Sequence, residues 1–121
     1  MKRVMLTAAL ALGLAAPAQA AMTLGEFLTK ANALQAKGAM ALFSRDLKPV
    51  MDEMKTAFAT LRVEGERRKA AGLPPRACPP AGTKLGTKEL LAMLNAVPPA
   101  DRMVSVKDGL LRAMTTRFPC R

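Results

Sequence analysis

The chain has 121 residues, half of them hydrophobic, and carries 19 Lys and Arg against 9 Asp and Glu, for a formal net charge of +10. It has no His, the commonest general base and metal ligand, and no Trp or Tyr on which bases or sugar rings could stack. Neither a GxGxxG nor a Walker sequence occurs. We therefore expect that the protein is not an enzyme and that it has no metal site, no cofactor and no nucleic-acid partner.

The first twenty residues have the three parts of a secretory signal peptide. Lys2 and Arg3 precede an apolar run, residues 4–16, and the small-residue sequence PAQA ends at Ala20, where we expect cleavage. This run is too short to span, as a helix, a hydrocarbon core about 30 Å thick, and position 21 is not the Cys of a lipoprotein. We predict a signal peptide over residues 1–20 and one periplasmic or secreted helical domain over residues 21–121, with no transmembrane segment and a net charge of +8.

Two helices are predicted in the N-terminal half. The first begins with the capping box T-L-G-E at Thr23, and its apolar stripe ends before Gly38. After an apolar link, residues 39–43, Asp46 is expected to cap the second helix, which should reach about residue 70. We expect its charged second half, residues 62–69, to project or fray. The apolar stripe of the second helix consists of Leu47, Val50, Met51, Met54, Phe58 and Leu61.

The C-terminal half begins with a connector. Four prolines within residues 73–82 exclude regular structure there. Thr87 is expected to cap a third helix that ends before Pro98, and the S-x-x-D box at Ser105 should start a fourth. The apolar positions of these two helices are Leu90, Leu91, Leu94, Val97, Val106, Leu110, Ala113 and Met114. With no sustained alternating pattern, the expected fold class is all-α, a small bundle of about four amphipathic helices.

Cys78 and Cys120 are the two cysteines of the chain. In an oxidising compartment an even count indicates a disulfide, and two cysteines allow one pairing. We predict that this bond pins the last helix to the proline-rich connector and contributes roughly 4 kcal/mol to stability. Their separation of 42 positions is unlike the close spacing of a redox-active pair.

Few groups remain that could carry chemistry. The carboxylates nearest to one another, Asp52 with Glu53 and Glu64 with Glu66, lie among Lys and Arg on predicted solvated faces, where we expect no catalysis. Met51 and Met54 have the spacing of a copper(I) site, but their place on the apolar stripe indicates core packing. The candidate partner-binding residues are the basic ones at the end of the second helix and in the connector: Arg67, Arg68, Lys69 and Arg76.

From Cys78 onward the chain resembles a known family. A Cys-Pro pair, two leucine-bearing turns, a proline break and a final amphipathic helix ending Phe118-Pro119-Cys120 resemble the C-terminal half of the Tai-type immunity proteins. These are helical periplasmic proteins that protect bacteria from type VI secretion amidase effectors. The resemblance implies that the chain binds a protein partner and inhibits an effector by plugging its active-site cleft. It is also compatible with a homodimer. We expect residues 67–76 to be the inserting element.

Two other functions fit the same composition. Small helical, disulfide-pinned periplasmic proteins such as HdeA act as acid-stress chaperones, and below about pH 4 the nine carboxylates of this chain would lose their charge and leave its cations unopposed. The other function is binding of a membrane surface by the basic part of the second helix. The immunity-like function is the first expectation, and the chaperone is its alternative.

Overall fold

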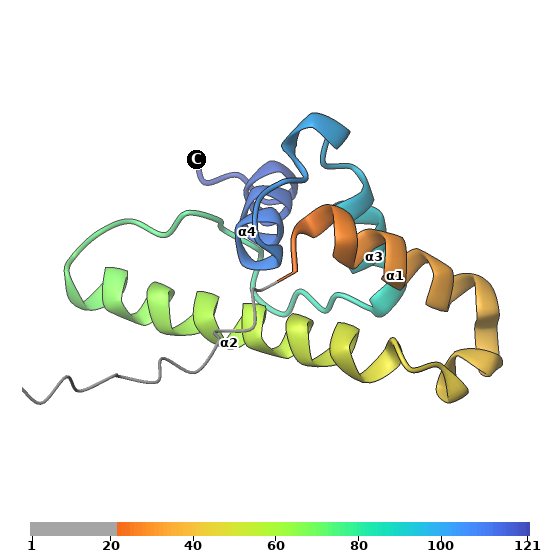
Figure 1. Cartoon of the computed structure of the whole chain (residues 1–121). Coiled ribbons are helices and arrows are strands. Elements are labelled where there is room, and N and C mark those ends of the chain that lie inside the picture. Colours follow the sequence, from red (N-terminus) through yellow and green to blue (C-terminus); the bar gives the residue numbers. More distant parts are fainter. Residues whose placement is uncertain (1–21) are drawn as a thin grey trace, which may run out of the picture.

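The structure, a computed structural model, describes residues 22–121, and the predicted signal peptide lies outside the described residues. Four α-helices and two short 3₁₀ helices follow one another along this part of the chain (Figure 1). They are α1 (Leu24–Lys37), η1 (Gly38–Phe43), α2 (Leu47–Ala70), α3 (Thr87–Asn95), η2 (Pro99–Asp101) and α4 (Val106–Arg117). Residues 22–121 contain no strand, only an isolated bridge between Thr23 and Ser105. The expected all-α bundle with one disulfide is confirmed.

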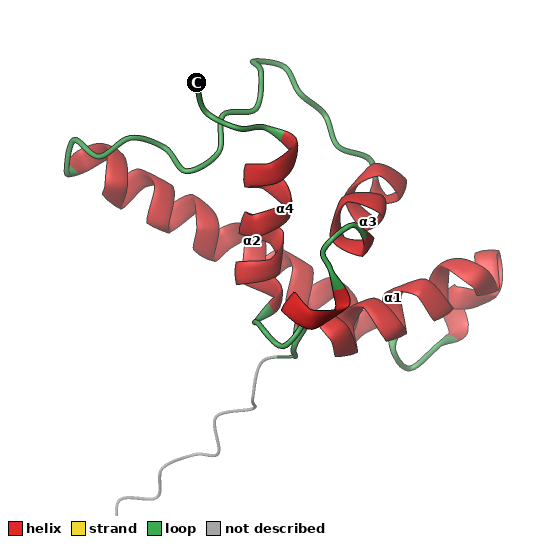
Figure 2. Cartoon of the chain, turned by 90° about the horizontal axis from the view of Figure 1, so that it is seen from above, coloured by secondary structure: helices red, strands yellow, loops and turns green. Residues whose placement is uncertain are grey.

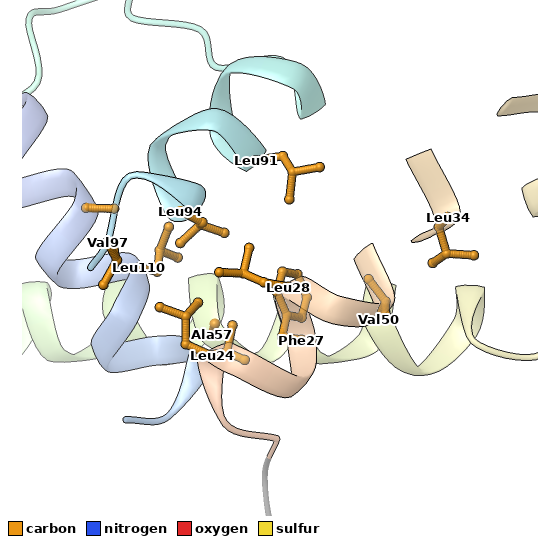
Figure 3. Packing of buried hydrophobic residues seen from close by; sticks show 12 residues of the cluster. Leu24, Phe27, Leu28, Leu34, Val50, Ala57, Leu91, Leu94, Val97 and Leu110 are labelled. Carbon is orange, nitrogen blue, oxygen red and sulfur yellow. The ribbon is translucent and has the colours of Figure 1, made fainter. Parts of the chain in front are cut away.

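Helix α2 is the longest element, with 24 residues, and the other helices lie on one side of it (Figures 1 and 2). Helix α1 packs on α2, α3 packs on α1, and α4 packs on α2 and α3. Their facing stripes form one core, in which the largest fully buried side chains are Leu24, Leu28, Leu94, Val106 and Leu110 (Figure 3). Each such side chain contributes about 1.5–3 kcal/mol by leaving water. No helix of residues 22–121 combines the length and the apolar character needed to cross a bilayer.

The start of α1 is held by the loop before α4. The amide of Leu24 donates to the Val104 carbonyl (2.8 Å), and the amide of Gly25 donates to the Arg102 carbonyl (3.0 Å). The Thr23 hydroxyl accepts from the Glu26 amide at 3.2 Å, as the capping box predicts. Three of the four amides that a helix start leaves unpaired are thereby satisfied. The N-terminus of the described chain is thus bound to its C-terminal half.

The course of α2 confirms its predicted length but corrects its predicted cap. Asp46 stands at the cap position with a helical backbone, and its side chain makes no capping bond; the Ser44 hydroxyl instead accepts from the Asp46 amide at 3.3 Å. The charged second half stays helical to Ala70 and does not fray, and its last turns extend beyond α4, as Figure 1 shows. Two of its side chains bond to other parts of the chain. Glu64 pairs with Lys107 of α4, and Arg68 donates to the carbonyl of Pro74.

Two members of the α2 stripe are less covered than the periodicity predicts. Met51 is 48% exposed and Phe58 is 39% exposed. The buried residues of α2 are Val50 and Ala57, and Leu47, Met54 and Leu61 pack partly against the core. The other helices lie on only one side of α2, so the edge of a wide stripe stays in contact with water. Core packing of Met51 is therefore incomplete, whereas Met54 packs against the core as expected.

Helix α3 begins at Thr87, with Gly86 at the cap position and no side-chain capping bond. The predicted Thr87 cap is wrong, because a side-chain oxygen reaches the first amides from the position before the helix, not from its first residue. The helix ends at Asn95, and buried Val97 follows in the turn. Ser105 does cap α4, since its hydroxyl accepts from the Asp108 amide at 3.2 Å.

Candidate functional site

The candidate site lies at the C-terminal end of α2, where three of the four predicted binding residues line one hollow. Arg68 and Lys69 reach it from the last turn of α2, and Arg76 reaches it from the proline-rich connector. Exposed Arg67 belongs to the same turn but is not part of the lining. The structure therefore brings Arg68, Lys69 and Arg76 together across eight positions of sequence.

The hollow has a volume of about 510 Å³ and is open to solvent on one side. Helices α2 and α4 form its floor, and the connector forms its outer wall. Most of the lining is apolar: Leu61, Leu73, Pro75, Ala77, Pro79, Leu111 and Met114. We call this hollow, with Arg68, Lys69 and Arg76, the basic groove. It joins an apolar floor to cationic side chains, a combination that suits a ligand with both apolar and acidic groups.

The connector is fixed to the two helices by one covalent bond and several hydrogen bonds. Cys78 and Cys120 form the predicted disulfide, with Cα atoms 5.0 Å apart. The Cys78 amide donates to the Phe118 carbonyl at 2.8 Å. Arg68 donates from Nε and Nη2 to the Pro74 carbonyl, at 3.1 and 2.8 Å. These bonds hold an otherwise irregular segment over Leu111 and Met114, and they tie the residues that follow α4 to the connector.

Arg68 therefore has two tasks. Arg68 as a whole is half-buried and its guanidinium clamps the connector, so part of its hydrogen-bonding capacity is used within the chain. Lys69 and Arg76 are exposed. They are the groove cations best placed to meet an acidic partner, and Arg68 contributes its charge from behind them.

The acidic residue of the groove lining, Glu64, is paired within the protein. Its Oε1 accepts from Lys107 Nζ at 2.7 Å, with about a third of each side chain exposed. The bond to Glu64 raises the pKa of Lys107 above its ordinary value, helped by the neighbouring Asp108 carboxylate, 3.6 Å away. Because the positive charge of Lys107 balances the negative charge of Glu64, the three lining cations make the electrostatic potential in the groove positive.

Of the other candidate carboxylates, Asp52 has a partner of the same kind. Asp52 accepts from Lys48 one turn earlier on α2, and this hydrogen bond lowers the pKa of Asp52 below its ordinary value. Met51 and Met54 line a separate hollow of about 370 Å³ between α1, α2 and α3. Among residues 22–121, no three His, Cys, Asp or Glu side chains gather closely enough to hold a metal ion.

Sequence reasoning missed two parts of the groove. Leu111 lines it beside buried Leu110, and this adjacency is a usable signal, because a second apolar residue next to a core position gives a helix a second apolar side. The Glu64–Lys107 pair joins residues 43 positions apart, and no local pattern predicts such a pair. A wider hollow of about 800 Å³ between α3 and α4 shares Leu111, but there Arg112 and Asp101 lie 3.7 Å apart and offset each other's charge.

Comparison of the chain with protein-family models, with curated proteins and with solved structures gives no match. The resemblance of the C-terminal half to Tai-type immunity proteins therefore remains an expectation from the sequence.

Proposed function

We propose that this protein is a non-catalytic binding protein of the periplasm or the extracellular space, which inhibits a cell-wall amidase effector by occluding its cleft. The observation that carries the proposal is the basic groove, an apolar hollow of about 510 Å³ with Arg68, Lys69 and Arg76 in its lining. An occluding inhibitor needs shape and charge complementarity to its target and no reactive group of its own.

The disulfide supports the location. A bond between Cys78 and Cys120 is typical of oxidising compartments, and it agrees with the signal peptide predicted at residues 1–20. The net charge of the chain supports the kind of partner, since a strongly basic protein is steered toward an acidic surface. The Tai-type resemblance supplies the effector class. It begins at Cys78, so within the groove it covers Pro79 of the connector and the α4 residues Leu111 and Met114.

In this proposal the groove receives an apolar side chain from the rim of the partner's cleft, and Lys69 and Arg76 pair with carboxylates beside it. The disulfide keeps the groove preformed in the free protein, which lowers the entropy that binding must overcome. The mechanism is thus steric, and its specificity lies in the placement of two exposed cations around an apolar floor.

The test measures inhibition of a cell-wall amidase encoded beside this gene. We expect the wild-type protein to inhibit it, and the Lys69→Glu/Arg76→Glu variant to bind about tenfold more weakly or worse. Lys55→Glu/Arg62→Glu is the matched control, because it reverses two exposed charges of α2 outside the groove lining. Equal losses of affinity in the two variants would show that net charge, not the groove, determines binding. Absence of binding by the wild type would refute the proposal.

One observation favours the alternative, an acid-stress chaperone of the HdeA kind. The Glu64–Lys107 ion pair joins α2 to α4, the two helices with the most extensive contact, and acid weakens links of this kind because carboxylates lose their charge below about pH 4. Exposure of the core at low pH would then offer apolar surface to unfolding proteins. Light scattering of an aggregating client at about pH 2–3, where carboxylates are protonated, decides this alternative: absence of protection excludes it.

A further inference from the structure

The turn between α1 and α2 exposes an unusual amount of apolar surface. Within η1, Met40 is 65% exposed, Leu42 is 74% exposed and Phe43 is 82% exposed. Single exposed apolar residues are ordinary on protein surfaces, whereas a contiguous cluster marks an interaction site. We call these three side chains the apolar tip. They lie at the far end of the molecule from the connector (Figure 1).

The backbone holds the apolar tip in this position. Gly38, at φ +57°, ends α1 in a conformation that favours glycine, and the chain continues as a 3₁₀ helix. Ala41 points inward and packs against the core. The Ser44 amide donates to the Ala41 carbonyl at 3.0 Å and closes the turn. The exposure of Met40, Leu42 and Phe43 is therefore built into an ordered element.

A 3₁₀ helix also solves a problem of apolar binding. Part of its backbone is paired by i→i+3 hydrogen bonds, and the Ser44 amide adds a bond to the Ala41 carbonyl, so the turn brings fewer bare backbone groups to an apolar boundary than an irregular segment of the same length. A longer irregular loop would not offer this. The tip is thus suited to a soft apolar phase as well as to a protein surface.

Basic residues flank the tip on both sides. Lys37 precedes η1 directly, Arg45 follows it by two positions, and both are exposed. Lys48 lies one position into α2 and pairs with Asp52, and Asp46 is half-buried beside them. The neighbourhood therefore keeps an excess of positive charge around three apolar side chains, an arrangement typical of proteins that lie on anionic lipid surfaces.

We propose that the apolar tip binds the surface of an anionic bilayer, with Leu42 and Phe43 entering the headgroup boundary and Lys37 and Arg45 meeting lipid phosphates. A second copy of the chain is the less favourable occupant, because a symmetric contact would bring Lys37 and Arg45 of both copies together and oppose like charges. The bilayer instead offers both the apolar and the acidic component. The basic groove, at the other end of α2, stays free in this arrangement.

The absence of Trp and Tyr allows a local test. Phe43→Trp places the sole strong fluorophore of the chain in the apolar tip, and Met103→Trp places it at a position of equal exposure, 82%, in the loop before α4. Each full-length variant is mixed with vesicles of phosphatidylglycerol and phosphatidylcholine or of phosphatidylcholine alone. We expect a blue shift of Trp emission, with quenching by brominated lipid, for Phe43→Trp on the anionic vesicles, and a weaker response at high salt.

A second measurement uses vesicle sedimentation and needs no fluorophore. Leu42→Ser/Phe43→Ser should lower the partition onto anionic vesicles about tenfold or more, since each side chain withdraws apolar surface from water. Met103→Ser should leave it unchanged, and residues 4–16 are the same in all variants. All four substituted chains replace exposed side chains, so circular dichroism should match the wild type.

Four results would overturn the proposal. An equal shift on neutral vesicles would show that binding does not need anionic lipid. An equal shift for Met103→Trp would show that binding is not specific to the apolar tip. A shift that depends on protein concentration without vesicles would assign the tip to contact between two copies. No shift under any condition would leave the tip without a lipid partner.

Discussion

At the C-terminal end of α2, Leu61 and Leu111 lie beneath a tethered connector, and Lys69 and Arg76 form the surface that a partner meets first. At the N-terminal end, Leu42 and Phe43 stand directly in water, with their cations beside them. Both ends combine apolar and basic residues, yet one forms a groove and the other a tip. The same composition thus yields a concave or a convex surface, according to whether a segment of chain covers it.

The disulfide accounts for that difference. At the groove, the Cys78–Cys120 bond and the Arg68 clamp hold ten irregular residues, 73–82, over the helices. At the tip, six residues close the turn as η1, and no other segment of residues 22–121 reaches over them. A groove of this kind suits a partner that inserts a side chain, whereas a tip suits a surface that the protein itself enters. The predictions below test this assignment, beginning with the largest expected effect.

Removal of the disulfide should affect the groove and leave the tip intact. Cys78→Ser/Cys120→Ser should lower the free energy of unfolding by up to roughly 4 kcal/mol, because the bond closes a long loop in the unfolded chain. Urea unfolding measures this loss, and limited proteolysis should show new cleavage within residues 73–82. The Phe43→Trp emission of the folded protein should not change. A stability loss below about 1 kcal/mol would mean that the hydrogen bonds alone secure the connector.

Two helical glycines differ in the space around them: the one at the groove has open space, and the one in the core is closely packed. A Cβ at Gly109 of α4 would lie 2.6 Å from Cδ2 of Leu24, a fully buried side chain, whereas a Cβ at Gly65 of α2 would meet nothing within 4 Å. Gly109→Ala should therefore cost about 1–3 kcal/mol by overpacking. Gly65→Ala should raise stability by about 0.4–1 kcal/mol through the lower entropy of the unfolded chain. Thermal unfolding of both variants gives the two signs, and a loss at Gly65 would show that the groove end has no room.

The elements that sequence reasoning predicted correctly share one property. The helices, the Thr23 and Ser105 caps, the connector and the disulfide are encoded by residues close together in the chain or, for the disulfide, by the presence of just two cysteines. The Thr87 cap failed because Gly86 is an equally good start, and a shift of one residue moves the side chain out of reach.

The parts that sequence reasoning missed depend on tertiary contacts. The pattern of α2 indicates which side chains are apolar but not how widely the other helices cover them, so the exposure of Met51 and Phe58 was not foreseen. Residues 39–43 were expected to be a simple link, because five residues carry too little periodicity to distinguish a covered turn from an exposed one. Arg68, Lys69 and Arg76 were predicted together as binding residues, but the apolar groove that they line could be recognised only from the fold.

The Glu64–Lys107 pair provides a pH-dependent test at the groove. A double-mutant cycle with Glu64→Gln and Lys107→Gln should give a coupling free energy of about 0.5–1 kcal/mol, since both side chains are partly exposed. Because the pKa of Lys107 is raised in the folded state, its contribution is complete below the ordinary value of 10.5 and is lost as the pH rises through the raised pKa. Urea unfolding between neutral and strongly alkaline pH measures this loss. A coupling that stays constant at alkaline pH would contradict the assignment.

The smallest stability effect is expected at the apolar tip. Leu42→Ser/Phe43→Ser should change the free energy of unfolding by no more than about 0.5 kcal/mol, because these side chains contact water rather than the core. Leu34→Ser, in α1 at 7% exposure, is the matched control and should cost several times as much. Urea unfolding of both variants therefore distinguishes a surface kept free for a partner from a part of the core. A tip variant that loses more than about 1 kcal/mol would show that Leu42 and Phe43 support the fold, and apolar residues that support the fold cannot also enter a membrane at no cost to stability.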